Sequence, residues 1–228
     1  MSFLSGLAEQ PANPWLSWSY VRDNSDTILS HLREHVTLTV LAVVIALAIA
    51  VPLALLARRV PWLAGPILGI SGVLYTVPSF ALFALMAPFT GFTRARTVLI
   101  GLVLYALLVL VRNTLVGLDG VPDEVREAAR GMGYGPARML WLIELPVALP
   151  AIMAGIRIAT VSTIALVTVG VIIGHGGLGQ LLFEGFNNNF FHAEIATGAV
   201  LCVALALVAD GLLYGLTRVL SPWARGRR

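Results

Sequence analysis

The sequence contains no lysine, because all fifteen of its basic residues are arginines. A Walker A loop needs a lysine that reaches the phosphates of a bound nucleotide. The absence of lysine therefore excludes an ATPase site of this type. The chain cannot be its own ATPase of that class.

Cysteine is nearly absent as well. The single Cys202 lies in an apolar run, which excludes a disulfide framework and a cysteine-based metal cluster. No Ser/His/Asp or His/Glu cluster falls near one face of an expected membrane span, so a membrane-embedded enzyme is not favoured. We expect no catalytic residues, no metal and no cofactor bound by this chain.

Charge is the third scarcity. Only 12% of the 228 residues are charged and 58% are hydrophobic, with a mean hydropathy of +0.87. Soluble domains have about 25% charged and about 45–50% apolar residues. The composition therefore predicts an all-α integral membrane protein whose length fits one bundle embedded in the lipid bilayer.

Five apolar stretches are candidates to cross the bilayer, which takes about 20 residues. The second contains Pro78, which we expect to kink that helix beside a pathway. We expect the chain to enter it through breaks at Pro61 and at Gly65-Pro66. The expected spans are 36–57, 67–88, 97–111, 149–173 and 193–217, preceded by an outer interfacial segment, 1–35, and followed by a basic tail, 218–228.

The arginines are distributed unevenly between the two sides of the predicted bundle. With the loop after the first span placed inside, eleven arginines face the cytoplasm and four face outward. By the positive-inside rule, the N-terminus lies outside and the C-terminus lies in the cytoplasm. The sequence pI of about 9.5 then reflects membrane topology, and a nucleic-acid partner is not required.

The longest cytoplasmic loop, 112–148, carries its own helix signals. Pro122 followed by two acidic residues predicts the start of a helix, which the glycines of 131–135 end. Pro136 can begin a second short helix that runs to about Glu144 and ends because of Pro146. We expect a helix–turn–helix across the cytoplasmic mouth.

The first of these helices has a narrow apolar stripe. Val125, Ala128, Ala129 and Met132 follow helical spacing and are flanked by charged residues. One interpretation is an ordinary amphipathic connector. The other is an element that docks in a groove of another protein.

The spacing of the loop carries a resemblance. It contains Glu127-Ala128-Ala129, then Gly133 after three residues, Ile143 after nine more, and Leu145-Pro146 after one more. The loop is similar to the coupling-loop pattern of permease subunits of type I bacterial ABC importers. The resemblance implies a five-span bundle whose loop sits in a cleft of a cytoplasmic ATPase dimer that uses ATP and Mg. It also assigns roles: docking and hinge to Glu127, Ala128, Ala129 and Gly133, and anchoring of the loop to Ile143, Leu145 and Pro146.

Further segments resemble the osmoprotectant branch of that family, among them "YTVPSFALFALMAPFTGF", "MAGIRIATV" and "VIIGHGGLGQLLFEGF". This branch imports glycine betaine, carnitine, choline or proline-like solutes. The resemblance implies a second permease subunit, identical or similar, and an extracytoplasmic substrate-binding protein. The alternative function is a stand-alone secondary transporter or channel, against which the sequence shows no internal repeat.

A glycine-rich turn follows the fourth span. Gly174 to Gly179 satisfies GxGxxG, but a dinucleotide site needs a preceding strand, and here an apolar helix precedes it. We expect a tight turn at the outer mouth, where a substrate-binding protein would dock, formed by Gly174, Gly176, Gly177 and Gly179. His175 is interpreted either as a gating or pH-sensing residue or as an exposed loop histidine.

Several residues within the spans are candidates for the solute pathway. Aromatic faces bind quaternary ammonium groups through cation–π contacts, and Asp210 is an acid well inside a span. Asp210 could steer a cation, pair with an arginine of a partner chain or make a structural hydrogen bond. The candidates are Tyr75, Pro78, Phe80, Phe83, Tyr105 and Asp210.

Overall fold

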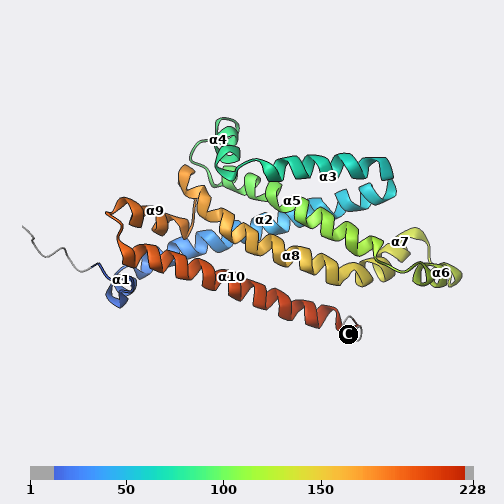
Figure 1. Ribbon diagram of the computed structural model, residues 1–228. Coiled ribbons are helices and arrows are strands. Elements are labelled where there is room, and N and C mark those ends of the chain that lie inside the picture. Colours follow the sequence, from blue (N-terminus) through green and yellow to red (C-terminus); the bar gives the residue numbers. More distant parts are fainter. Residues whose placement is uncertain (1–12, 224–228) are drawn as a thin grey trace, which may run out of the picture.

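The computed structural model describes residues 13–223, and every regular element in this range is helical. Four long helices run side by side along the bundle (Figure 1): α2 (Ser25–Arg59), α5 (Ala95–Asp119), α8 (Leu145–Val167) and α10 (His192–Leu220). Each is long and apolar enough to cross a membrane, α8 together with the turns that flank it. The expected all-α membrane bundle is confirmed.

Helix α2 packs through a stripe of small residues. Leu38 is followed at every fourth position by an alanine, and all five side chains are buried in the main core between α2 and α5. Small residues at this spacing let two helices approach closely. The small residues of the stripe are Ala42, Ala46, Ala50 and Ala54, and Leu38 lies one turn before them. The helix itself begins eleven residues before the expected span 36–57.

The stretch expected to be one kinked span is two helices. α3 (Pro61–Thr76) and α4 (Ser79–Thr90) are bent by 101° at the break between them, so that α4 lies across the direction of α3 (Figure 1). Val77 is extended, with φ −63° and ψ 128°, as the residue before a proline prefers. Pro78 therefore breaks the helix instead of kinking it. The expected break at Gly65-Pro66 is wrong, because Pro66 lies inside α3.

Short elements cover the two ends of the bundle. α6 (Asp123–Gly131) and α7 (Pro136–Met139) lie at the end where α10 finishes, whereas α1 (Trp18–Asp23) and α9 (Gly179–Asn187) lie at the opposite end (Figure 1). A 3₁₀ turn, Thr168–Ile173, joins α8 to the segment before α9. The central loop and the glycine-rich turn are thus separated by the length of the bundle.

The second loop helix does not end at Pro146, so that expectation is wrong. α7 continues through a π-helical turn, Leu140–Glu144, directly into α8. Pro146 is the second residue of α8, where a missing N–H costs little because the π turn has just replaced the α-helical hydrogen-bond pattern.

Candidate functional site

The outer surface of α6 is uncovered. Glu127 and Ala128 are exposed, and Val125 and Met132 expose 37% and 66% of their surface. Only Ala129 of the expected apolar stripe is buried, at 1% exposure. The helix starts and ends as its sequence predicts, but most of its apolar side chains are left uncovered by the rest of residues 13–223. Such a surface is suited to contact with another protein.

Gly133 forms the expected bend after α6. Its φ of +83° lies in the left-handed region, which glycine adopts without the steric cost that a Cβ brings. The N–H of Gly133 donates to the carbonyl of Arg130 at 2.9 Å, and the N–H of Tyr134 donates to Ala129 at 3.1 Å. These two bonds turn the chain from α6 toward α7.

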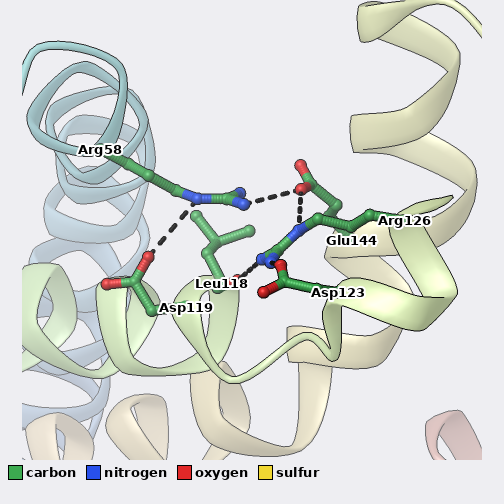
Figure 2. Close-up of polar contacts among 6 residues, drawn as sticks. All are labelled: Arg58, Leu118, Asp119, Asp123, Arg126 and Glu144. Atoms are coloured by element: carbon green, nitrogen blue, oxygen red, sulfur yellow. Dashed lines mark hydrogen bonds and ion pairs between the residues drawn. The ribbon is translucent and has the colours of Figure 1, made fainter. Parts of the chain in front are cut away.

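Beneath α6 lies an ion network centred on Glu144 (Figure 2). One carboxylate oxygen, Oε1, accepts a hydrogen bond from Nη2 of Arg58 at 2.7 Å and another from Nε of Arg126 at 2.9 Å. Glu144 ends the π turn, Arg58 lies at the end of α2 and Arg126 lies on α6. A single acid therefore joins three elements.

Two further acids and a carbonyl extend the network toward α5. Arg126 donates to Oδ1 of Asp123 and to the Leu118 carbonyl, each at 2.8 Å, while Nε of Arg58 lies 3.4 Å from Oδ1 of Asp119 (Figure 2). Burial by itself lowers the pKa of the Arg126 guanidinium, but its hydrogen bonds with Glu144 and Asp123 outweigh this and raise the pKa. Arg126 is thus held in its charged form.

The residues expected to anchor the loop lie beside this network. Ile143, Leu145 and Pro146 are half-buried, and Leu145 packs on a small core formed by Leu118, Ala148 and Ile152. Gly117 of α5 allows α8 to approach closely, because an added Cβ at this position would lie only 2.8 Å from the Ala148 carbonyl oxygen.

An open cavity of about 780 Å³ separates the end of α2 from the loop. Its polar lining includes Arg58, Arg59, Arg130 and Glu144. The charged side chains that line this cavity are therefore mostly positive.

At the opposite end, the glycine-rich turn is packed against His35. Gly177 has φ +52°, and a Cβ there would lie 2.6 Å from the Cβ of His35. His35 is fully buried: its Nδ1 accepts from the N–H of Leu178 at 3.2 Å, and its Nε2 lies 3.1 Å from the Ile164 carbonyl. The same ring therefore holds both the turn and α8.

His175 is half-buried, which corrects its interpretation as an exposed loop histidine. Its Nδ1 lies 2.7 Å from Oε1 of Glu34, and its Nε2 lies 3.2 Å from the carbonyl of Thr93. The remaining glycines of the turn, Gly174, Gly176 and Gly179, surround the end of the 3₁₀ turn. Residues 13–223 contain no strand, in keeping with the rejected dinucleotide site.

The aromatic pathway candidates divide by exposure. Phe83 is fully buried against Gly101, and the hydroxyl of Tyr105 donates to the carbonyl of Val77, so both pack within the bundle. Tyr75 meets Tyr105 edge to face at 6.0 Å and is 43% exposed. Phe80, at 58%, is exposed.

Asp210 pairs with an arginine of its own chain. Arg157 binds both carboxylate oxygens, at 2.8 and 2.7 Å, and its guanidinium also lies over the ring of Tyr214. The pair lines an open groove of about 560 Å³ between α8 and α10.

Sequence reasoning did not single out Glu144, Arg58, Glu34 or His35 as functional residues. An available signal was Glu144 itself, an acid inside the apolar stretch "MLWLIELPVALP". A second was the adjacent pair Glu34-His35 at the start of an apolar run. Neither signal identifies the partner, since each partner lies far away in the sequence.

Comparison with known proteins identifies the architecture. Residues 42–226 match the family model described as "Binding-protein-dependent transport system inner membrane component". The chain is similar in structure to a subunit of the MetNI methionine ABC transporter in an inward-facing form, with a TM-score of 0.72, 21% identity, and coverage of 83% of this chain and 94% of that chain. The similarity confirms the fold.

Three permease proteins are similar to this chain over almost its whole length. The osmoprotectant import permease protein OsmW of Salmonella typhimurium is 42% identical, covering 89% of this chain and 96% of OsmW. Two glycine betaine/carnitine/choline transport system permease proteins of Bacillus subtilis, OpuCD and OpuCB, are each 33% identical. They cover 90% of this chain, and the match includes 89% of OpuCD and 93% of OpuCB.

Proposed function

The chain belongs to the family of inner-membrane components of binding-protein-dependent transport systems, and from this premise we propose that the solutes it carries are osmoprotectants such as glycine betaine, carnitine or choline. The chain is a multi-pass permease subunit that works with an ATPase and a binding protein. The solute class is supported by relatives at 42% and 33% identity that carry such descriptions.

The observation that carries the coupling mechanism is that one face of α6 is exposed, while its other side is held by the ion network around Glu144. Glu127 and Ala128 are exposed for contact with the ATPase, whereas Ala129 is buried beneath them. Gly133 sets the direction of the chain after the docking helix. Ile143, Leu145 and Pro146 carry the movement into α8, because the helix continues without interruption from the π turn.

The proposed orientation places α6 and the C-terminal end of α10 in the cytoplasm and the glycine-rich turn outside, where the binding protein docks. The arginine distribution supports it. We would replace the native Cys202 by alanine and introduce Glu124→Cys or Asn187→Cys. An impermeant maleimide applied to intact cells should label only Asn187→Cys, and labelling of Glu124→Cys alone would reverse the orientation.

We propose that the pathway forms between two permease subunits. Bacillus subtilis has two different relatives, OpuCD and OpuCB, with the same transport-system description, which favours a pair of unlike chains over two identical copies. Purification through a tag on this chain, followed by intact-mass analysis of the complex, would distinguish the two compositions. Tyr75 and Phe80 are the aromatic candidates with surface free to meet a quaternary ammonium group.

The decisive experiment is reconstitution into proteoliposomes with the ATPase, the binding protein and, where present, the second permease. Uptake of labelled glycine betaine, carnitine, choline and proline should require ATP in the vesicle lumen, on the side of the ATPase, and the binding protein outside the vesicle. Uptake by this chain alone down a gradient would establish the carrier alternative. ATP-driven uptake of none of the four solutes would overturn the osmoprotectant assignment.

A further inference from the structure

We propose that Glu144 is a positioning residue that joins the loop helix α6 rigidly to α2 and α8, so that a displacement of α6 moves these helices as one body. The inference rests on the proposed role of α6 as the docking helix for the ATPase. It assigns a coupling role to a residue outside the docking surface itself.

The contacts of Glu144 are shared between elements that are far apart in sequence. Arg58 lies 86 residues before Glu144, and Arg126 lies 18 residues before it. Both guanidinium groups donate to the same oxygen, Oε1 (Figure 2). No other side chain of the network contacts both Arg58 of α2 and Arg126 of α6. Loss of the Glu144 carboxylate therefore removes the connection between these two helices.

Exposure separates Glu144 from the other acids of the network. The side chain of Glu144 is 11% exposed, whereas those of Asp119 and Asp123 are 63% and 85% exposed. Among residues 13–223, each aspartate also pairs with a single arginine. Charge-assisted hydrogen bonds strengthen where water is excluded, so the contacts of Glu144 contribute the rigid part of the network.

The π turn explains how Glu144 reaches its partners. A π turn accommodates one extra residue, which rotates the preceding side chains by about 100° relative to a continuous α-helix. Glu144 ends this turn and faces the two arginines, while Leu145 and Ala148, directly beyond it, pack toward the core around Leu118. The local helix geometry thus presents an acid on one side and apolar anchors on the other.

Without Glu144, α6 keeps fewer attachments to the bundle. Ala129 remains buried, and Arg126 still donates to the Leu118 carbonyl. The docking face, centred on Glu127 and Ala128, is untouched. The ATPase would still bind and hydrolyse ATP, but α6 would move relative to the bundle without displacing α2 and α8.

The test uses the complete transporter in proteoliposomes and measures solute imported per ATP hydrolysed. Glu144→Gln should lower this ratio about tenfold, within the range of typical coupling free energies, while the ATPase still copurifies in normal amount. Glu144→Asp, which keeps the charge, should recover part of the ratio. A merely structural loss would reduce uptake and hydrolysis together and leave the ratio unchanged.

The matched control is Asp119→Asn, because Asp119 lies outside α6 and pairs with the same Arg58, but its side chain is 63% exposed and exposed ion pairs contribute little. It should leave the ratio at the wild-type value. Arg58→Gln removes the contact of α2 with Glu144, together with its contact to Asp119, and should lower the ratio as Glu144→Gln does. This second variant keeps the test valid where Glu144→Gln fails to fold.

An unchanged ratio in Glu144→Gln or in Arg58→Gln overturns the proposal. Absence of ATP-driven uptake in the wild-type complex would instead refute the proposed function, so the two failures are distinct. Hydrogen exchange gives an independent readout: amides of 123–131 should exchange faster in Glu144→Gln, whereas those in the middle of α5 should not change.

Discussion

Arg157 of α8 and Asp210 of α10 are joined by two parallel hydrogen bonds, from Nε to Oδ1 at 2.8 Å and from Nη2 to Oδ2 at 2.7 Å. This pair attaches the second half of α10 to α8. The buried residues of α10, Ala193, Glu194 and Gly198, all lie in its first two turns, and none lies in its most apolar 18-residue window.

Removal of one partner of this pair should destabilise the protein more than removal of both. Asp210→Leu leaves the charged Arg157 unpaired within a membrane-spanning helix, and Arg157→Leu leaves the charged Asp210 unpaired in the same way. We expect each single variant to lower the melting temperature in detergent by several degrees and the double variant to recover most of the loss. Arg112→Gln, which alters an exposed arginine of α5, is the control. Additive losses in the double variant would contradict a direct ion pair.

Neighbouring alanines of α6 should respond in opposite ways to the same enlargement. Ala128 is exposed, so Ala128→Leu should leave thermal stability unchanged and weaken copurification with the ATPase. Ala129 is 1% exposed, so Ala129→Leu overpacks the base of the helix and should cost about 1–3 kcal/mol of stability. Melting curves and pull-down yields measure the two effects. Equal behaviour of the two variants would show that α6 does not dock by its exposed face.

The glycine-rich turn should tolerate alanine at one position and not at another. Gly174 has φ +81° with open space around a Cβ, so Gly174→Ala should cost only the left-handed backbone, about 1–2 kcal/mol. Gly177→Ala adds a contact 2.8 Å from the Cα of His35, which cannot move freely, and should cost about 2–4 kcal/mol. Thermal unfolding in detergent measures both. The reverse order would show that the turn is not packed on α2.

His35 should be replaceable only in part. His35→Ala leaves the Leu178 N–H and the Ile164 carbonyl without their side-chain partner, at a cost of about 1–3 kcal/mol. His35→Asn restores an acceptor near the Nδ1 position, and His35→Gln restores a donor near the Nε2 position. Both should be intermediate in stability between alanine and histidine. If all three variants were equally stable, neither hydrogen bond would contribute to the fold.

Local signals predicted the loop helix well. Pro122, the two acids after it and the glycines of 131–135 delimit α6 where the structure has it, and the bend expected at Gly133 is formed with a left-handed backbone. These features depend on backbone preferences that act within a few residues. The same locality explains the error at Pro146, since the π turn that accommodates this proline is not encoded by any simple residue pattern.

The break between α3 and α4 could not be predicted from local sequence signals. Pro78 alone is compatible with a kink or with a complete break, and the 101° bend depends on how α4 packs against α5 and the 3₁₀ turn. Buried Phe83, lodged against Gly101, belongs to that packing. An aromatic in an apolar run therefore carries no sequence signal that separates core from pathway.

The sequence by itself determined a membrane-embedded helical bundle, an arginine-rich side and a polar loop that contains a short helix, because composition and short-range backbone chemistry act without reference to the rest of the fold. Only the tertiary structure decided that Glu144 meets Arg58, that His35 supports Gly177 and that Asp210 is neutralised by Arg157. Those pairs join positions far apart in the chain, and their geometry exists only once α2, α5, α8 and α10 have packed together.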